Sequence, residues 1–133
     1  MESKQHEAVA TSLAPAAIGP YSQAIVAGDW IFLSGQIGLD PKTGELVAGG
    51  TAAEARQALA NLAAVLRAAG GELSTVVRTT LYLVDLADFA TVNEIYSSVF
   101  SPPFPARVTV GVASLPRGAR IEVEAVAYRR PPG

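Results

Sequence analysis

Two segments of this chain are apolar on both faces of the strands that they are predicted to form, and this feature constrains the fold most. Residues 30–34 form a short apolar run that stops at a glycine, and residues 76–84 are rich in β-branched residues, as strands usually are. Strands with two apolar faces need both faces covered. The sequence predicts only two helices, which can cover one face of a sheet. We therefore expect the second face to be buried against other copies of the chain, most simply in a closed cyclic homo-oligomer.

The two predicted helices carry clear start and stop signals. Thr51-Ala-Ala-Glu54 fits a capping box, in which Thr51 and Glu54 satisfy each other's free backbone donors. The helix that follows has an apolar stripe and is closed by Gly70-Gly71. The second helix is predicted to start near Asp88, a good N-cap residue, and to end before Pro102-Pro103. Its predicted apolar face comprises Phe89, Val92, Ile95, Tyr96 and Val99.

Further strands complete the predicted domain. Three more segments have the pattern of strands, and the first of them forms a hairpin with residues 30–34: residues 22–26, 107–112 and 120–128. The order ββαβαββ predicts a single α+β domain with two helices on one face of a mixed sheet. The length of 133 residues fits one domain. Residues 1–12 are predicted to be an N-terminal tail and residues 129–133 a C-terminal tail.

Composition excludes several classes of site. The chain has no cysteine, which excludes disulfide scaffolds, thiolate metal sites and cysteine nucleophiles. Its only histidine, His6, lies in the predicted tail, so we do not expect a Ser-His-Asp triad. A metal site would need a shell made mostly of carboxylates, and the sequence shows no such cluster, so we expect no metal. Glycine-rich phosphate-binding motifs are absent as well.

Charge and hydropathy limit the partners. The net charge is −2, so no overall basic field favours binding to nucleic acid. No apolar run approaches the roughly 20 residues of a membrane-spanning helix, and the N-terminus lacks the pattern of a secretory signal. We therefore expect a cytoplasmic protein without a membrane partner.

A few polar residues could carry chemistry. Arg107 is at the start of a predicted strand, after a rigid Phe-Pro-Ala segment. It could bind a substrate carboxylate by two parallel hydrogen bonds. Alternatively, it could be a surface residue or the partner of a structural ion pair. Glu122 and Glu124 share one face of a strand; one of them could act as a general base, or both could be solvated carboxylates. The spacing of residues in the sequence does not determine whether Tyr21 and Asn93 have structural or functional roles.

Five short blocks of the chain resemble, in order, the signature of the RidA/YjgF family of reactive-intermediate deaminases. They span residues 14–128 and comprise Ala14–Gln23, Ser34–Ile37 with Asp40–Glu45, Asp88–Asn93, Phe104–Arg107, and Leu115–Gly118 with Ile121–Ala125. The resemblance implies a chorismate-mutase-like fold, a homotrimer with clefts at the subunit interfaces, and no cofactor. It also implies hydrolysis of 2-imino acids, which arise from enamines such as 2-aminoacrylate, to 2-oxo acids and ammonia.

The resemblance implies roles for particular residues. Arg107 falls on the residue that binds the substrate carboxylate, and Glu122 on the residue that positions or activates the attacking water. Tyr21 falls on a tyrosine of the cleft and is expected to assist catalysis. The remaining implied cleft residues bind substrate: Ser34, Gly35 and Asn93. Glu124 is expected to have a supporting role.

The chain departs from the family pattern at one position of the cleft. Some members carry a cysteine two residues after the arginine, where this chain has Thr109. Any thiol-dependent activity should therefore be missing, while backbone groups at Thr109 could still contact substrate. Two other functions stay open: a non-catalytic ligand-binding or chaperone-like trimer that uses the same clefts, and, with less support from the charge, a ribonuclease or translation inhibitor.

Overall fold

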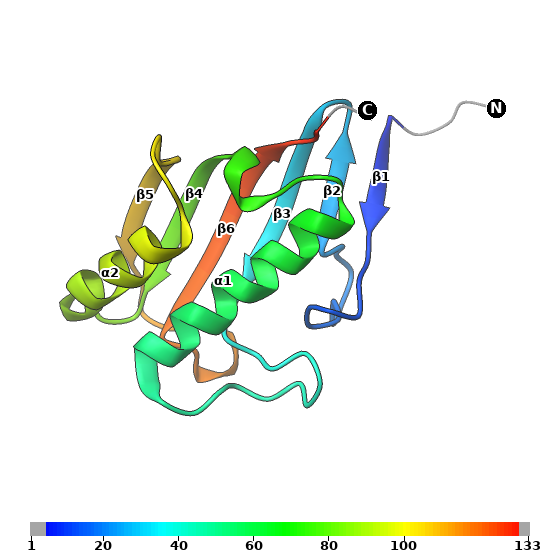
Figure 1. The fold of residues 1–133 in the computed structure, drawn as a ribbon. Coiled ribbons are helices and arrows are strands. Elements are labelled where there is room, and N and C mark those ends of the chain that lie inside the picture. The colour runs from blue at the N-terminus through cyan, green and yellow to red at the C-terminus, as the bar shows by residue number, and fades with distance from the viewer. Residues whose placement is uncertain (1–4, 131–133) are drawn as a thin grey trace.

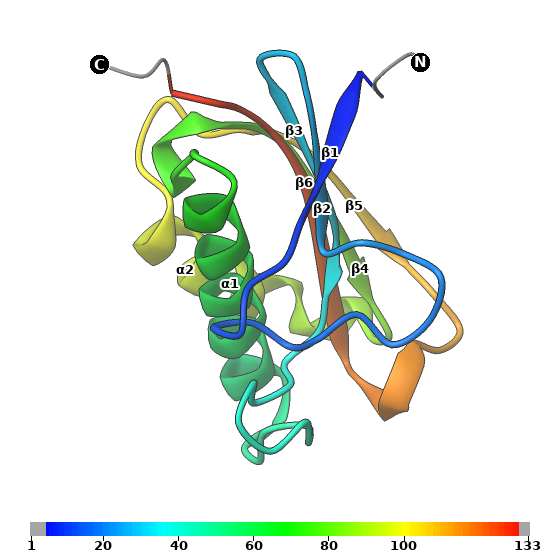
Figure 2. The ribbon, with the colours of Figure 1, turned by 90° about the vertical axis from the view of Figure 1, so that its right-hand side faces the viewer.

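Both α-helices pack on the same face of one sheet (Figures 1 and 2). The structure is a computed structural model, and it describes residues 5–130. Its strands and α-helices, in chain order, are β1 (His6–Val9), β2 (Ala24–Ala27), β3 (Trp30–Gln36), α1 (Gly50–Ala68), β4 (Val76–Leu83), α2 (Phe89–Val99), β5 (Ala106–Gly111) and β6 (Ile121–Tyr128). The strand order is β1-β2-β3-β6-β4-β5, with β4 and β5 parallel and the other neighbours antiparallel. The predicted α+β domain with two helices on one face of a mixed sheet is confirmed.

The core lies between the helices and the sheet, and the central strand β6 shows how it forms. Alternate residues of β6 are buried toward the helices: Ile121, Val123, Ala125 and Ala127. The stripe of α1 meets them with Leu59, Leu62, Val65 and Leu66, all buried. Full burial of one such leucine or valine side chain contributes roughly 1.5–3 kcal/mol. This packing fixes which face of β6 points away from the helices.

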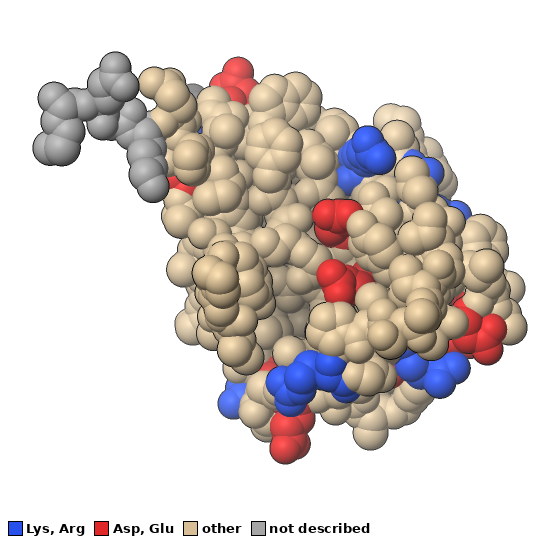
Figure 3. Space-filling model, turned by 180° about the vertical axis from the view of Figure 1, so that it is seen from behind, with Lys and Arg blue, Asp and Glu red and all other residues tan. Residues whose placement is uncertain are grey.

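The face of the sheet opposite the helices, here called the open face, carries apolar side chains that are exposed in the single chain. Phe32 is 49% exposed and Tyr128 42%, and on β5 the exposed fractions of Val108 and Val110 are 41% and 36%. Figure 3 shows this face: it is mostly uncharged, with acidic side chains near its middle. The prediction that the two helices leave the second face of the sheet uncovered is thus confirmed for the single chain.

The ends of the chain differ from the predicted tails. His6–Val9 form β1, which pairs with β2 at the edge of the sheet, whereas the sequence predicts a tail there. Four residues, two polar followed by two apolar, show no alternation that would predict an edge strand. At the other end, the backbone N–H of Arg129 donates to the carbonyl of Asp29 (2.7 Å) and that of Arg130 to the carbonyl of Gly70 (3.0 Å). Residues 1–4 and 131–133 of the predicted tails lie outside the described residues.

The predicted capping box of α1 is wrong. The helix starts at Gly50, its N-cap residue is Gly49, and no side chain caps it. The Thr51 hydroxyl instead donates to Asp88 Oδ2 at the start of α2 (2.6 Å), and Glu54 Oε1 accepts the backbone N–H of Arg120 (2.7 Å). Both side chains are buried. They form these hydrogen bonds with distant segments in place of the local hydrogen bonds of a capping box.

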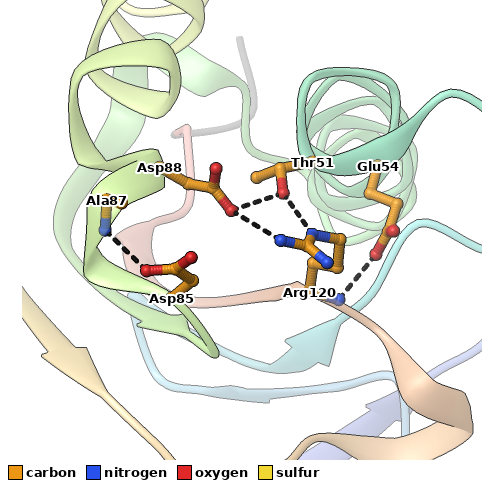
Figure 4. A network of polar contacts seen from close by, with 6 residues as sticks. All are labelled: Thr51, Glu54, Asp85, Ala87, Asp88 and Arg120. Carbon is orange, nitrogen blue, oxygen red and sulfur yellow. Dashed lines mark hydrogen bonds and ion pairs between the residues drawn. The ribbon is translucent and has the colours of Figure 1, made fainter.

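Arg120 links these contacts into one network (Figure 4). Its Nε donates to the Thr51 hydroxyl (2.7 Å), and its Nη2 lies 3.4 Å from Asp88 Oδ2. The Asp88–Arg120 ion pair is partly exposed, and such pairs contribute only about 0–1 kcal/mol. Its importance is positional, because it ties the start of α2 to the start of α1 and to the residue before β6. Asp88 therefore precedes α2 as predicted, but its side chain does not cap the helix.

We predict that Thr51→Val lowers the free energy of unfolding by about 1–3 kcal/mol, because it removes the hydrogen bonds of a buried hydroxyl to the charged side chains of Asp88 and Arg120. Urea denaturation at one fixed protein concentration measures the change. Thr51→Ser keeps the hydroxyl and should cost clearly less. Equal losses for the valine and serine variants would contradict the network as the reason for Thr51.

Candidate functional site

Four of the residues that the sequence singles out line one cavity. Tyr21, Ser34, Gly35 and Glu122 surround a space of about 470 Å³ between the loop before β2, strand β3 and the start of β6. Glu122 points to the open face because Ile121 and Val123 on either side of it are buried toward the helices. Most of the remaining wall is apolar: Pro15, Ala16, Ile18, Ile37, Leu39 and Pro116. The cavity is thus an apolar pocket with a carboxylate in its wall.

The backbone of β3 is shaped to accommodate this carboxylate. The pairing of β3 with β6 is irregular between Leu33 and Gln36, and Gly35 lies within that irregularity. A Cβ atom at position 35 would come within 2.8 Å of the Glu122 Cδ atom, so the absence of a side chain leaves the space that the carboxylate fills. The neighbouring Ser34 hydroxyl donates to the carbonyl of Ser22 (2.6 Å), which ties β3 to the segment that carries Tyr21.

Tyr21 stands at the rim of the cavity rather than in the core. Its side chain is 54% exposed, and its hydroxyl accepts the backbone N–H of Ile18 (3.3 Å). The loop that carries it is anchored by Gln23, a buried side chain whose amide donates to the carbonyls of Thr11 (3.0 Å) and Pro15 (2.8 Å). A fixed loop therefore presents an exposed aromatic ring and its hydroxyl to the cavity.

The environment of Glu122 favours its protonated form. Burial is the main cause that raises the pKa of Glu122 above its ordinary value, and the charge of Glu124 on the same face adds to it. Glu124 in turn accepts a hydrogen bond from the hydroxyl of Tyr82 on β4. This hydrogen bond, together with burial, raises the pKa of Tyr82. A half-buried carboxyl group whose pKa is raised above its ordinary value retains its proton more readily than an exposed one, which suits a general acid–base group.

Arg107 lies on the other side of the sheet from Glu122. Its guanidinium carbon is 5.5 Å from the ring centroid of Phe89 and 5.0 Å from that of Tyr96, both on α2. Tyr96 is itself buried, and its hydroxyl shares a hydrogen bond with that of Thr79 (2.8 Å). Burial raises the pKa of Tyr96, although Thr79 and Arg107 act against this. Cation–π contacts of this kind hold the planar guanidinium in place with its donors available to a planar anion.

Asn93 and Thr109 belong to the side of the sheet that carries Arg107. Asn93 is half-buried and lies one helical turn from both Phe89 and Tyr96 on α2. Thr109 follows Arg107 by two residues on β5 and therefore shares its face. Its hydroxyl oxygen is the one buried side-chain polar atom without a hydrogen-bond partner within residues 5–130.

The predicted site residues thus fall into two groups on opposite sides of the sheet, here called half-sites. The carboxylate half-site has Tyr21, Ser34, Gly35 and Glu122 around the cavity, and the guanidinium half-site has Asn93, Arg107 and Thr109 beside α2. The predicted residues do not meet within one copy. The sequence patterns do not identify three side chains that contact these half-sites. The helical pattern places Phe89 and Tyr96 on the apolar face of α2, and Arg117 stands out only as part of a family block.

Within residues 5–130, no three His, Cys, Asp or Glu side chains gather in a way that could hold a metal ion. No helix in the described part of the chain is long and apolar enough to cross a membrane.

The architecture and the polar groups define the class: a small α+β protein with a half-buried carboxylate in an apolar cavity and an arginine stacked on aromatic rings. The family model described as Endoribonuclease L-PSP matches residues 11–129. The chain belongs to this family, which confirms the resemblance to RidA/YjgF proteins.

Individual relatives agree over nearly the whole length. A human protein named 2-iminobutanoate/2-iminopropanoate deaminase is 53% identical over 131 residues, which cover 98% of this chain and 96% of the human protein. The crystal structure of the YjgF gene product from E. coli has 48% sequence identity and a TM-score of 0.88, covering 93% of this chain and 99% of that chain. E. coli TdcF, solved with bound serine, has 39% identity and a TM-score of 0.88, with the same two coverages.

We predict that Glu124→Gln lowers the pKa of Glu122 but leaves it above the ordinary value, because burial, the larger cause, remains. Glutamine keeps an oxygen that can accept from Tyr82, so the change removes charge alone. The pKa is measured by NMR titration of the ¹³C-labelled Glu122 carboxyl. An unchanged titration would contradict the electrostatic coupling of the two carboxylates.

The same shift sets a pH dependence of stability. Because the folded chain holds the Glu122 proton more tightly than the unfolded chain, this group stabilises the fold fully below its ordinary pKa. That contribution is lost as the pH rises through the raised pKa. The Glu124→Gln variant should lose less stability over this interval than the unchanged protein.

Proposed function

We propose that this protein is a deaminase that hydrolyses 2-imino acids to 2-oxo acids and ammonia. The observation that carries the proposal is the half-buried Glu122 carboxyl with its raised pKa in an apolar cavity. It occurs in a chain 53% identical to a human protein named 2-iminobutanoate/2-iminopropanoate deaminase. An imine carbon is already electrophilic, so the reaction needs an oriented substrate and an activated water rather than a covalent nucleophile.

The side chains of the two half-sites fit the steps of this reaction. Arg107 binds the substrate carboxylate by two parallel hydrogen bonds, which places the imine carbon. Glu122 in its ionised form accepts a proton from a water molecule as the water oxygen attacks that carbon, giving a carbinolamine. The attacked imine is protonated (C=NH2+), so this carbinolamine is neutral. Glu122 returns the proton to the nitrogen, and as the C–N bond breaks and ammonia leaves, the ionised Glu122 accepts the hydroxyl proton while the C=O bond forms; that proton then passes to ammonia or solvent. The remaining residues of the two half-sites contact the substrate: Tyr21, Ser34, Gly35, Asn93 and Thr109. No step of the reaction requires a thiol.

The proposal includes assembly into a homotrimer with the site at the subunit interfaces. Three observations support assembly: Arg107 and Glu122 lie on opposite sides of the sheet, the open face exposes apolar side chains such as Phe32 and Val108, and that face has few charges. Arg107 lies on β5, an edge strand of the sheet, so packing of the open face of one copy against the β5 edge of the next would let the Glu122 cavity meet that copy's Arg107. Cytoplasmic location stays a prediction from the sequence.

The assay that tests the activity generates an imino acid from 2-aminobutanoate with an amino-acid oxidase and traps it with semicarbazide. The protein should lower trapping by consuming the imine. Arg107→Ala should reduce kcat/KM at least about tenfold through loss of the charge-assisted contacts. Glu122→Gln should reduce kcat by about 10²–10⁴-fold through loss of proton transfer.

The matched control is Arg130→Ala, which removes an exposed arginine that pairs with Glu72 outside both half-sites. Full trapping in the presence of the unchanged protein would overturn the deaminase proposal and favour the non-catalytic ligand-binding trimer. The ribonuclease alternative has little support from the site, because Glu122 and Glu124 would repel a phosphate backbone.

A mixing experiment tests whether the site is shared between copies. Arg107→Ala and Glu122→Gln chains are each expected to be nearly inactive alone. When the two are co-assembled at equal amounts, random pairing gives intact arginine and glutamate at about one quarter of the interfaces, so activity should return to about that fraction. Arg107→Ala chains carried through the same procedure alone are the control, and a mixture as inactive as either variant would contradict the shared site.

A further inference from the structure

Arg117 has a backbone conformation that its residue type does not favour. Its φ of 61° and ψ of 17° make it the one non-glycine residue with positive φ among residues 5–130. It lies in the short 3-10 turn Pro116–Gly118 that leads toward β6. Glycine adopts this conformation freely, whereas a bulky side chain does so under strain. Strained residues of this kind cluster at ligand-binding and catalytic sites, so the arginine side chain calls for a functional explanation.

The Arg117 side chain lies exposed beside the cavity, and no carboxylate within residues 5–130 pairs with it. Its Nη2 donates to the backbone carbonyl of Gly44 (3.0 Å) in the loop before α1. The two ion pairs within residues 5–130 involve other arginines, Arg120 and Arg130. A guanidinium has five N–H donors, so one contact with a carbonyl leaves most of its capacity for an anion.

Arg117 lies in the wall of the same cavity as Glu122 and Tyr21. The volume of about 470 Å³ falls in the range of pockets that hold ligands much larger than a four-carbon imino acid. The wall between the polar groups is apolar, with side chains such as Ile18 and Leu39. The cavity can therefore take a substrate side chain along its apolar wall and meet the end of that side chain with a cation.

We propose that Arg117 binds an acidic group at the end of the substrate side chain, so that the substrates include 2-imino acids with a side-chain carboxylate. The inference rests on the proposed function, in which Arg107 binds the main carboxylate and Glu122 acts at the imine carbon. Without a cation in the cavity, Glu122 and Glu124 would repel a second carboxylate. Arg117 supplies the compensating charge and, through its planar donors, the geometry for two hydrogen bonds.

The test compares two ligands that differ only at the end of the chain. 2-Oxoglutarate and 2-oxopentanoate both have five carbons and are the products expected from the corresponding imino acids, but only the first has a second carboxylate. Isothermal titration calorimetry of the full-length protein at low ionic strength gives both Kd values. The unchanged protein should bind 2-oxoglutarate more tightly, and Arg117→Asn should reduce the ratio of the two affinities by about tenfold.

Two further variants keep the test decisive. Asparagine tolerates the left-handed conformation, and Arg117→Gly removes the strain altogether, so both should fold and both should lose the preference. Arg56→Gln removes an exposed arginine of α1 and should retain it. An unchanged affinity ratio in Arg117→Asn and Arg117→Gly would overturn the proposal, as would an equal loss of ratio in Arg56→Gln.

The outcome is separable from that of the deaminase assay. If the unchanged protein hydrolysed no imine but the affinity ratio still depended on Arg117, the proposed activity would fail while the role of Arg117 as a ligand for a second carboxylate stood. If hydrolysis were confirmed, kcat/KM for the imines formed from glutamate and from 2-aminopentanoate should show the same dependence on Arg117. Equal kcat/KM ratios in the unchanged protein and Arg117→Asn would contradict it.

Discussion

The alternation of β6 is the constraint on which the rest of the molecule depends. Its odd-numbered residues from Ile121 to Ala127 are buried under the helices, and the period of two residues then forces Glu122 and Glu124 onto the open face. A shift of one residue would put both carboxylates into the apolar core, at a cost that no contact there offsets. The free energy that forms the core therefore also determines where the Glu122 carboxyl lies.

The same sheet keeps the two half-sites apart. Glu122 faces the cavity on the open side, whereas Arg107 lies against the rings of α2 on the helix side. Each half-site is held by contacts within the chain: the irregular stretch of β3 accommodates the carboxylate, and the aromatic pair holds the guanidinium. The fold of each copy thus holds Glu122 and Arg107 in place before assembly. The proposed assembly then has only to bring the two half-sites of neighbouring copies together.

Periodicity and turn residues predicted most of the fold because they are local properties. The strand of alternating residues from Ile121 to Tyr128, the helix closed by Gly70-Gly71 and the shared face of Glu122 and Glu124 all follow from such patterns. The capping box failed because Thr51 and Glu54 found partners in Asp88 and Arg120, far along the chain. The separation of Arg107 from Glu122 could not be predicted either, since it depends on how β5 is placed beside β4 and on which side α2 packs.

The glycine at position 35 gives the cavity a further property. One small volume beside β3 can hold either a side chain on residue 35 or the carboxyl group of residue 122, because an added Cβ would meet that group. The obstruction is the flexible end of Glu122 rather than backbone, so a larger residue at position 35 would redirect the carboxylate and leave the strands in register. A change at residue 35 can therefore move the Glu122 carboxylate out of its place in the cavity without loss of the fold. Among chains of this architecture, the size of residue 35 and the presence of an acid at position 122 are expected to be coupled.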